Sequence, residues 1–203
     1  MPITLKSSAL TGDALRIASS ALLVALKLKD RGTHDHVLRV ARVSVLIGRE
    51  LKLERAELLA LYYGAQLHDI GKICTKDSVL KKEGELTAIE RMHMRAHVIE
   101  GTAALAELEM PVHIVDIVGQ HHERFDGHGY PCGLAGAGIT LGARIVAVAD
   151  AYDAITNNRC YRAGKGYQAA AAALTRCSGS QFDPRVVQAF FRIPEEKLPC
   201  AGN

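Results

Sequence analysis

The chain has 203 residues, with 25 Lys and Arg against 22 Asp and Glu, which gives a formal charge of +3. Hydrophobic residues make up 48% of the sequence, which disfavours disorder, and six prolines with eighteen glycines in no regular period exclude a collagen-like chain. The small charge and the lack of a basic run argue against a nucleic-acid polymer as partner. The five cysteines are widely spaced, which argues against a disulfide framework or a zinc knuckle.

No membrane or export signal is predicted. The most apolar early stretch, residues 14–26, is interrupted by Arg16 and two serines and is shorter than the ~20 residues that span a bilayer. Residues 1–6 contain one positive side chain, and no clear cleavage site follows. We therefore expect a cytoplasmic protein that does not associate with membranes.

Taken in chain order, the periodic segments of the first half predict helices. The stretch before residue 34 is either one amphipathic helix that packs on the rest or the tail of a regulatory region. Apolar residues at helical spacing follow over residues 38–46 and end near residues 51–53, and a second helix runs over residues 54–68 until Gly71 stops it. No alternating strand pattern of useful length occurs, so the expected fold class is all-α.

The second half is predicted to be helical as well. Thr87 and Glu90 have the spacing of a capping box and predict a helix that carries His97. Pro111 opens the next helix, which ends at His121 and His122. Three further helices are expected over residues 144–157, 167–174 and 185–192.

Histidines and aspartates stand out against this background. Asp150 lies inside a nearly wholly apolar helix, where a carboxylate is costly to bury unless it is paired or binds a metal. A surface Asp on an amphipathic helix is the alternative. His68 and Asp69 close another apolar helix, and adjacent helical residues project ~100° apart, so both could reach one ion that Lys72 also faces. A helix-terminal pair without a metal is the alternative here.

Two adjacent histidines at a helix end, His121 and His122, extend this set. Taken together, these imidazoles and carboxylates are the ligand types that divalent metals prefer. Six stretches then carry a more specific pattern over roughly residues 36–190: His36 with the following Val-Leu-Arg-Val, residues 68–72 (HDIGK), His97 with Gly101, residues 121–131 (HHERFDGHGYP), residues 144–150 (RIVAVAD) and residues 159–162 (RCYR). In this order they resemble the HD-GYP family, a branch of the HD metal-dependent phosphohydrolases.

The resemblance implies a fold, a reaction and a ligand set. The fold would be a five-helix HD core with additional helices around a buried metal site. The reaction would be hydrolysis of cyclic di-GMP to pGpG, GMP or both, with a hydroxide that bridges two ions as nucleophile. The divalent ions would be iron or manganese, and Asp69 would bridge them. Carried over by position, the metal ligands are His36, His68, Asp69, His97, His121, His122 and Asp150.

The resemblance also assigns groups around the metals. Lys72 would act with Asp69 in catalysis by placing a positive charge at the phosphate or leaving group. Arg159 and Arg162 would bind the cyclic dinucleotide, since guanidinium groups suit phosphate. A glycine-rich turn follows His121 and His122 and comprises Asp126, Gly127, Gly129, Tyr130 and Pro131. In the family pattern this turn would be structural, and it would also contact diguanylate cyclase (GGDEF) domains.

Two positions depart from the family pattern. Three-metal members carry a Glu four residues before the first histidine, where this chain has Gly32, so two metals are expected. The residues Asp30 and Asp35 have the wrong spacing to replace that Glu. Cys160 stands where the family usually has Pro, which puts substrate affinity in doubt.

The expected organisation is an N-terminal helical segment over residues 1–33, a phosphohydrolase domain over residues 34–193 and a tail over residues 194–203. Two other functions compete with cyclic di-GMP hydrolysis: a phosphohydrolase for another nucleotide, including a hybrid cyclic dinucleotide, and a non-catalytic cyclic dinucleotide sensor or interaction module. Of the four histidines outside the ligand set, His113 and His128 are expected on the surface or in turns, and His34 is expected to point away from His36 on the same helix. His93 is expected on the surface, with a place beside the ligands as the alternative.

Overall fold

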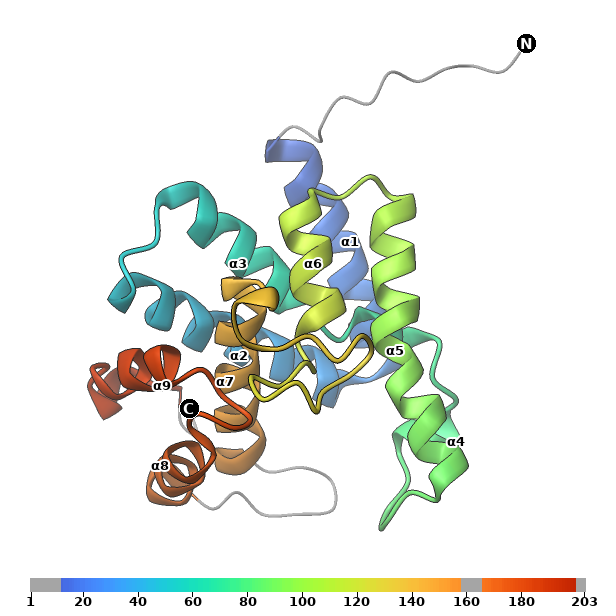
Figure 1. Cartoon of the computed structure of the whole chain (residues 1–203). Helices are drawn as coiled ribbons and strands as arrows, with labels where there is room; N and C mark the ends of the chain where they lie inside the picture. The colour runs from blue at the N-terminus through green and yellow to red at the C-terminus, as the bar shows by residue number, and fades with distance from the viewer. Residues whose placement is uncertain (1–11, 158–165, 200–203) are drawn as a thin grey trace.

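The computed structural model describes residues 12–157 and 166–199. Apart from one isolated bridge between Ser178 and Phe182, the secondary structure of these residues is helical, which confirms the predicted all-α class (Figure 1). Three short 3-10 helices accompany the α-helices: η1 (Ile70–Ile73), η2 (Gly136–Gly138) and η3 (Glu195–Lys197). The α-helices are α1 (Gly12–Lys29), α2 (Arg31–Glu50), α3 (Arg55–Leu67), α4 (Asp77–Leu80), α5 (Ala88–Glu107), α6 (Val112–Gln120), α7 (Leu141–Thr156), α8 (Gly166–Cys177) and α9 (Pro184–Phe191).

Local capping explains where two of the helices begin. The predicted capping box opens α5, since the amide of Glu90 donates to Thr87 Oγ1 at 3.3 Å and the amide of Thr87 donates to the Glu90 carboxylate at 2.7 Å. Helix α2 begins at Arg31, earlier than the apolar spacing indicated, because Asp30 caps it by accepting from the amide of Thr33 at 2.7 Å.

Two apolar clusters form the core. One lies among α2, α3, α6, α7, α8 and α9, and the other lies among α1, α2, α3, α5 and α6. Helix α1 belongs to this core because Leu15 and Leu26 are buried in the second cluster. In Figure 1, α2 and α7 lie at the centre, with α8 and α9 on one side and α5 and α6 on the other. The division of the chain after residue 33, which falls inside α2, stays a prediction.

A glycine brings the turn after α3 against α5. A Cβ atom at Gly71 would stand 2.0 Å from the carbonyl oxygen of His97 and 2.7 Å from the amide nitrogen of Gly101. Only glycine allows two backbones to approach so closely. This contact holds the His68 and Asp69 pair beside His97, which lies 29 residues after His68 in the sequence.

Among the helices of the described ranges, none combines the length and the apolar character needed to cross a membrane.

Candidate metal centre

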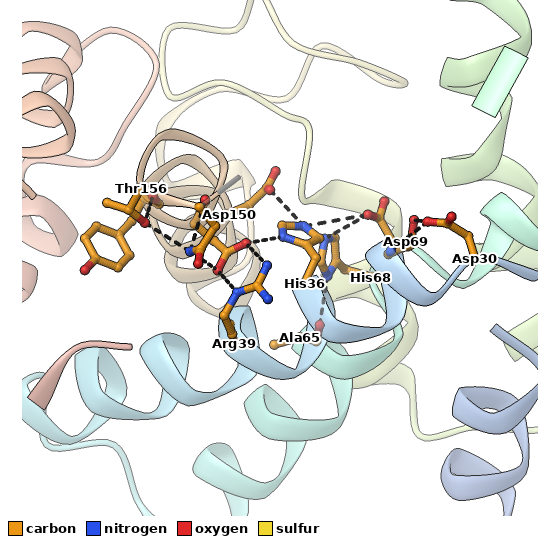
Figure 2. A network of polar contacts seen from close by, with 12 residues as sticks. Asp30, His36, Arg39, Ala65, His68, Asp69, Asp150 and Thr156 are labelled. Carbon is orange, nitrogen blue, oxygen red and sulfur yellow. Dashed lines mark hydrogen bonds and ion pairs between the residues drawn. The ribbon is translucent and has the colours of Figure 1, made fainter. Parts of the chain in front are cut away.

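Five helices converge on the ligand set predicted from the sequence. His36 projects from α2, His97 from α5 and Asp150 from α7. His68 and Asp69 follow the end of α3, and His121 and His122 follow the end of α6. The structure brings all seven side chains together, and Figure 2 shows His36 between the carboxylates of Asp150 and Asp69.

The potential ligand atoms fall into two groups. His36, His68 and Asp69 form the first group, and His97, His121 and His122 form the second. Within each group the ligand atoms lie within 4.8 Å of one another. Asp150 adjoins the first group, with its Oδ1 at 3.2 Å from His36 Nε2. Each group therefore offers enough nitrogen and oxygen donors for one divalent ion.

The Asp69 carboxylate lies between the two groups. Its Oδ2 is 3.5 Å from His68 Nε2 and 3.8 Å from His36 Nε2, whereas its Oδ1 is 3.3 Å from His97 Nε2. One carboxylate thus turns one oxygen to each group, which is the arrangement that a residue shared by two ions requires.

Hydrogen bonds fix four of the five imidazoles in one orientation. The Nδ1 atom of His68 donates to the carbonyl of Ala65 at 2.8 Å, that of His97 to Met94 at 2.5 Å and that of His121 to Val118 at 2.7 Å. His36 Nδ1 donates to the Asp153 carboxylate at 2.6 Å. Because Nδ1 is the donor in each ring, Nε2 is the atom that faces the centre, as in metal-ligating histidines generally.

The residues fit a cation. The Nε2 atoms of His97 and His121 lie 3.4 Å apart, and because Nδ1 of each ring donates to a backbone carbonyl, these two nitrogens face each other. His68 Nε2 is buried and has no hydrogen-bond partner among the described residues. Such an arrangement is costly by itself. Positive ions between these nitrogens would remove the cost, and mixed imidazole and carboxylate ligands suit first-row divalent metals.

The electrostatics of the protein alone differ between the two groups. Burial lowers the pKa values of His68 and His121, and it lowers the pKa of His122 to about 4, so these rings are neutral at pH 7. Burial acts the same way on His36, but hydrogen bonds with Asp150 and Asp153 outweigh it and raise the pKa of His36 to about 9. Burial by itself would raise the pKa of Asp69, but the positive charge of Lys72 outweighs burial and keeps this pKa well below its usual range.

Asp153 is a residue of this site that the sequence reasoning missed. It accepts from His36 Nδ1 and, at 2.6 and 2.9 Å, from the Nε and Nη2 atoms of Arg39. Its side chain is 2% exposed, so the pair with Arg39 is shielded from water on the aspartate side. Asp153 lies one turn after Asp150 on α7, a spacing that could have indicated a second inward-facing carboxylate.

The turn after α6 is held by a second buried carboxylate that the sequence reasoning missed. Glu123 accepts from the amides of residues 132, 133 and 134 at 2.7, 3.1 and 3.0 Å. Within the turn, Gly127 has a φ of +81°, and a Cβ at Gly129 would lie 2.3 Å from the amide nitrogen of Arg124. Asp126 pairs with Arg124 at 2.6 Å, and the Tyr130–Pro131 bond is cis.

This turn contacts the second ligand group through an aromatic ring. Tyr130 stacks on His122 with ring centroids 4.8 Å apart, and the guanidinium of Arg95 lies 4.7 Å from the centroid of the Tyr130 ring. Burial raises the pKa of Tyr130, so its hydroxyl stays neutral. Arg95 is an exposed cation beside the ligand set that no motif indicated.

Of the three predicted substrate-binding residues, Lys72 lies in the part of the chain that the structure describes. Its Nζ lies 2.6 Å from Asp69 Oδ2. Arg159 and Arg162, together with Cys160, lie outside the described residues. The nearby aspartates Asp30 and Asp35 are engaged elsewhere, since the first caps α2 and the second pairs with His34 at 2.8 Å.

Of the four histidines outside the ligand set, His34 lies on α2, pairs with Asp35 at 2.8 Å and has a side chain that is 14% exposed. His93 and His113 are exposed, and the side chain of His128 is 84% exposed.

Comparison with known proteins now identifies the family. The family model described as HD domain matches residues 6–186, which is most of the chain. The chain belongs to the HD-domain family. Sequence relatives of this HD-domain chain confirm the predicted HD-GYP resemblance, since several are named cyclic di-GMP phosphodiesterases.

Two relatives and one solved structure illustrate the likeness. The cyclic di-GMP phosphodiesterase response regulator RpfG of Xanthomonas campestris is 41% identical over 85% of this chain and 46% of its own length. The 3'3'-cGAMP-specific phosphodiesterase 1 of Vibrio cholerae is 37% identical over 72% of this chain and 34% of its own length. The chain thus spans about half or less of the curated relatives it matches.

The solved structure supports the fold. The crystal structure of a cyclic GMP-AMP specific phosphodiesterase of V. cholerae superposes with a TM-score of 0.65 at 20% identity, over 88% of this chain and 48% of that one. The HD-domain arrangement of helices is therefore shared.

Proposed function

We propose that this HD-domain protein is a metal-dependent phosphodiesterase that hydrolyses cyclic di-GMP to pGpG, GMP or both. One observation carries the proposal: the Asp69 carboxylate lies between two groups of ligand atoms whose imidazoles turn Nε2 toward a common centre. Two divalent ions, iron or manganese, would be held by the seven residues His36, His68, Asp69, His97, His121, His122 and Asp150. When bound, they would polarise the phosphoryl oxygen and activate water for attack.

The chain's own groups have separate tasks in this proposal. Lys72 supplies a point charge for the phosphate or the leaving oxygen, since its ammonium group already lies at the Asp69 carboxylate. Tyr130 keeps His122 in place by stacking on it. Arg159 and Arg162 are proposed to bind the two phosphates of the substrate, and such a local cluster agrees with a net charge of only +3.

The substrate is proposed from the relatives. The relative that is 41% identical is named for cyclic di-GMP, and the relative that is 37% identical is named for 3'3'-cGAMP. Both substrates are cyclic dinucleotides with two phosphodiester bonds, so a hybrid cyclic dinucleotide is the second candidate. A cytoplasmic location, predicted from the sequence, suits either substrate.

Turnover by anaerobically purified protein loaded with Fe²⁺ or Mn²⁺ tests the proposal. Cyclic di-GMP and 3'3'-cGAMP are offered separately and together, and chromatography resolves the linear and fully hydrolysed products. We expect cyclic di-GMP to be consumed faster, Asp69→Ala to abolish turnover and His113→Ala, an exposed histidine, to leave it unchanged. Binding without turnover would instead identify a sensor, and faster cGAMP turnover would correct the substrate.

The glycine-rich turn is proposed as a contact for diguanylate cyclase (GGDEF) domains. A pull-down with a purified GGDEF domain is the test, with Tyr130→Ala as the variant. Retention of the partner by the wild type, and its loss from a Tyr130→Ala protein that melts normally, would support the contact. No retention by the wild type, or loss of the fold in the variant, would count against it.

A further inference from the structure

Helices α2 and α3 form an antiparallel pair whose outer face carries a groove. The pair is joined by the short connection 51–54, and Gly48 lets the helices approach, since a Cβ there would stand 2.9 Å from Leu58 and Leu61 (Figure 1). The groove has a volume of about 650 Å³. Its lining comes from both helices and from the C-terminal η3: Arg42, Val45, Leu46, Arg49, Arg55, Leu58, Leu59, Tyr62 and Lys197.

The lining residues repeat one helical spacing twice. Four lie on α2 and four on α3, and in each helix they occupy positions i, i+3, i+4 and i+7. This spacing covers one face over two turns, or about 10 Å along the axis. Two such rows lie side by side, one on each helix, and leave a groove between them of the kind that receives a third helix. Leu59 is 48% exposed and Tyr62 is 37% exposed in the α3 row.

The charged residues that line the groove are all positive. Arg42, Arg49, Arg55 and Lys197 are exposed, and within the described ranges none of them forms a salt bridge. Among the residues that the structure describes, none that lines the groove is acidic. Two neighbouring acids are engaged elsewhere, since Glu50 pairs with Arg192 at 3.4 Å and Glu57 accepts from the amide of Glu54 at 2.8 Å.

We propose that this groove binds an acidic amphipathic helix of a partner protein. Apolar residues of that helix at i, i+3, i+4 and i+7 would cover Val45, Leu46 and Leu59, and flanking Asp or Glu side chains would meet the arginines at the groove's ends. The shape favours a helix over a flat lipid surface, because the apolar residues line a groove of about 650 Å³ between two helices. The spread of the cations along two helical turns also disfavours a single phosphate.

The proposal is tested with a fluorescein-labelled amphipathic peptide that carries leucines at the stated positions and glutamates elsewhere. A second peptide keeps the leucines and replaces every glutamate by lysine. We expect fluorescence anisotropy to show binding of the acidic peptide that weakens as salt rises, and little binding of the basic peptide. The double variant Arg42→Glu/Arg49→Glu should weaken the binding at least about tenfold.

Controls separate the groove from general charge effects. Arg176→Glu, which reverses an exposed arginine on α8, should leave peptide affinity unchanged, and thermal melting should show that both variants fold. Equal binding of the two peptides, or unchanged binding by the double variant, would overturn the proposal. So would concentration-dependent dimerisation lost in the double variant, which would make a second copy the occupant, or groove-dependent binding to phosphatidylglycerol vesicles without peptide binding.

Discussion

Replacing Asp153 by Asn tests whether a residue outside the ligand set controls metal affinity. The carboxylate accepts from His36 Nδ1 at 2.6 Å and from Arg39 at 2.6 and 2.9 Å. Asparagine has the same shape but carries no charge, and its amide group offers only one oxygen to these donors. Loss of partners that orient a metal-ligating histidine typically costs 10–100-fold in metal affinity, or about 1.4–2.8 kcal/mol.

Only one of the two ligand groups contains His36, so one binding event should weaken. Titration of chelator-stripped protein with Mn²⁺ should show one site weakened about 10–100-fold and the other little changed. Asp183→Asn is the matched control. Asp183 is also a buried aspartate, but its partner is Arg144, at 2.5 Å, and not one of the ligands. Both variants should lose about 1–3 kcal/mol of stability. Equal Mn²⁺ affinity in Asp153→Asn and the wild type would refute the reasoning.

Three further predictions concern the fold around the site. Gly71→Ala should destabilise the protein by at least about 1–3 kcal/mol in thermal melting, because its Cβ would collide with the backbone of α5, whereas Gly138→Ala, with open space around it, should not. Glu123→Ala should cost about 1–3 kcal/mol, since three amides lose a charged acceptor, and the exposed Glu107→Ala is its control. The metal-free protein should lose stability as pH falls from about 6.5 toward 4, because the folded pKa of His122 is about 4 and those of His68 and His121 are also lowered, so the unfolded chain binds more protons. It should also lose the contribution of His36 as pH rises from about 6.5 to 9, since that pKa is raised. A melting temperature that stays flat between pH 7 and 5 would contradict the pH prediction.

The sequence predicted the helices well where the signal is local, and the side chains that it singled out as ligands lie together in the structure. The capping box of Thr87 and Glu90 marks the start of α5 directly, and Pro111 marks that of α6. The start of α2 was less clear, since apolar spacing alone does not register the cap by Asp30.

The residues around the ligands are harder to predict, since the spacing of Asp153 from Asp150 indicates an inward-facing carboxylate but does not identify its partner. Asp153 binds His36 across 117 positions of sequence, and no local pattern encodes such a pair. Glu123 meets amides nine to eleven residues later, which requires the turn to be known first. Candidate ligands can be recognised in the sequence by their residue type. The groups that orient them depend on packing between helices that are distant in sequence.

The metal content of the protein tests the central claim most directly. Anaerobically purified protein, measured by elemental mass spectrometry, should hold two iron or manganese ions per chain, and Asp69→Ala should hold fewer because its carboxylate faces both ligand groups. No bound ion, one ion per chain, or three ions in the wild type would contradict the account.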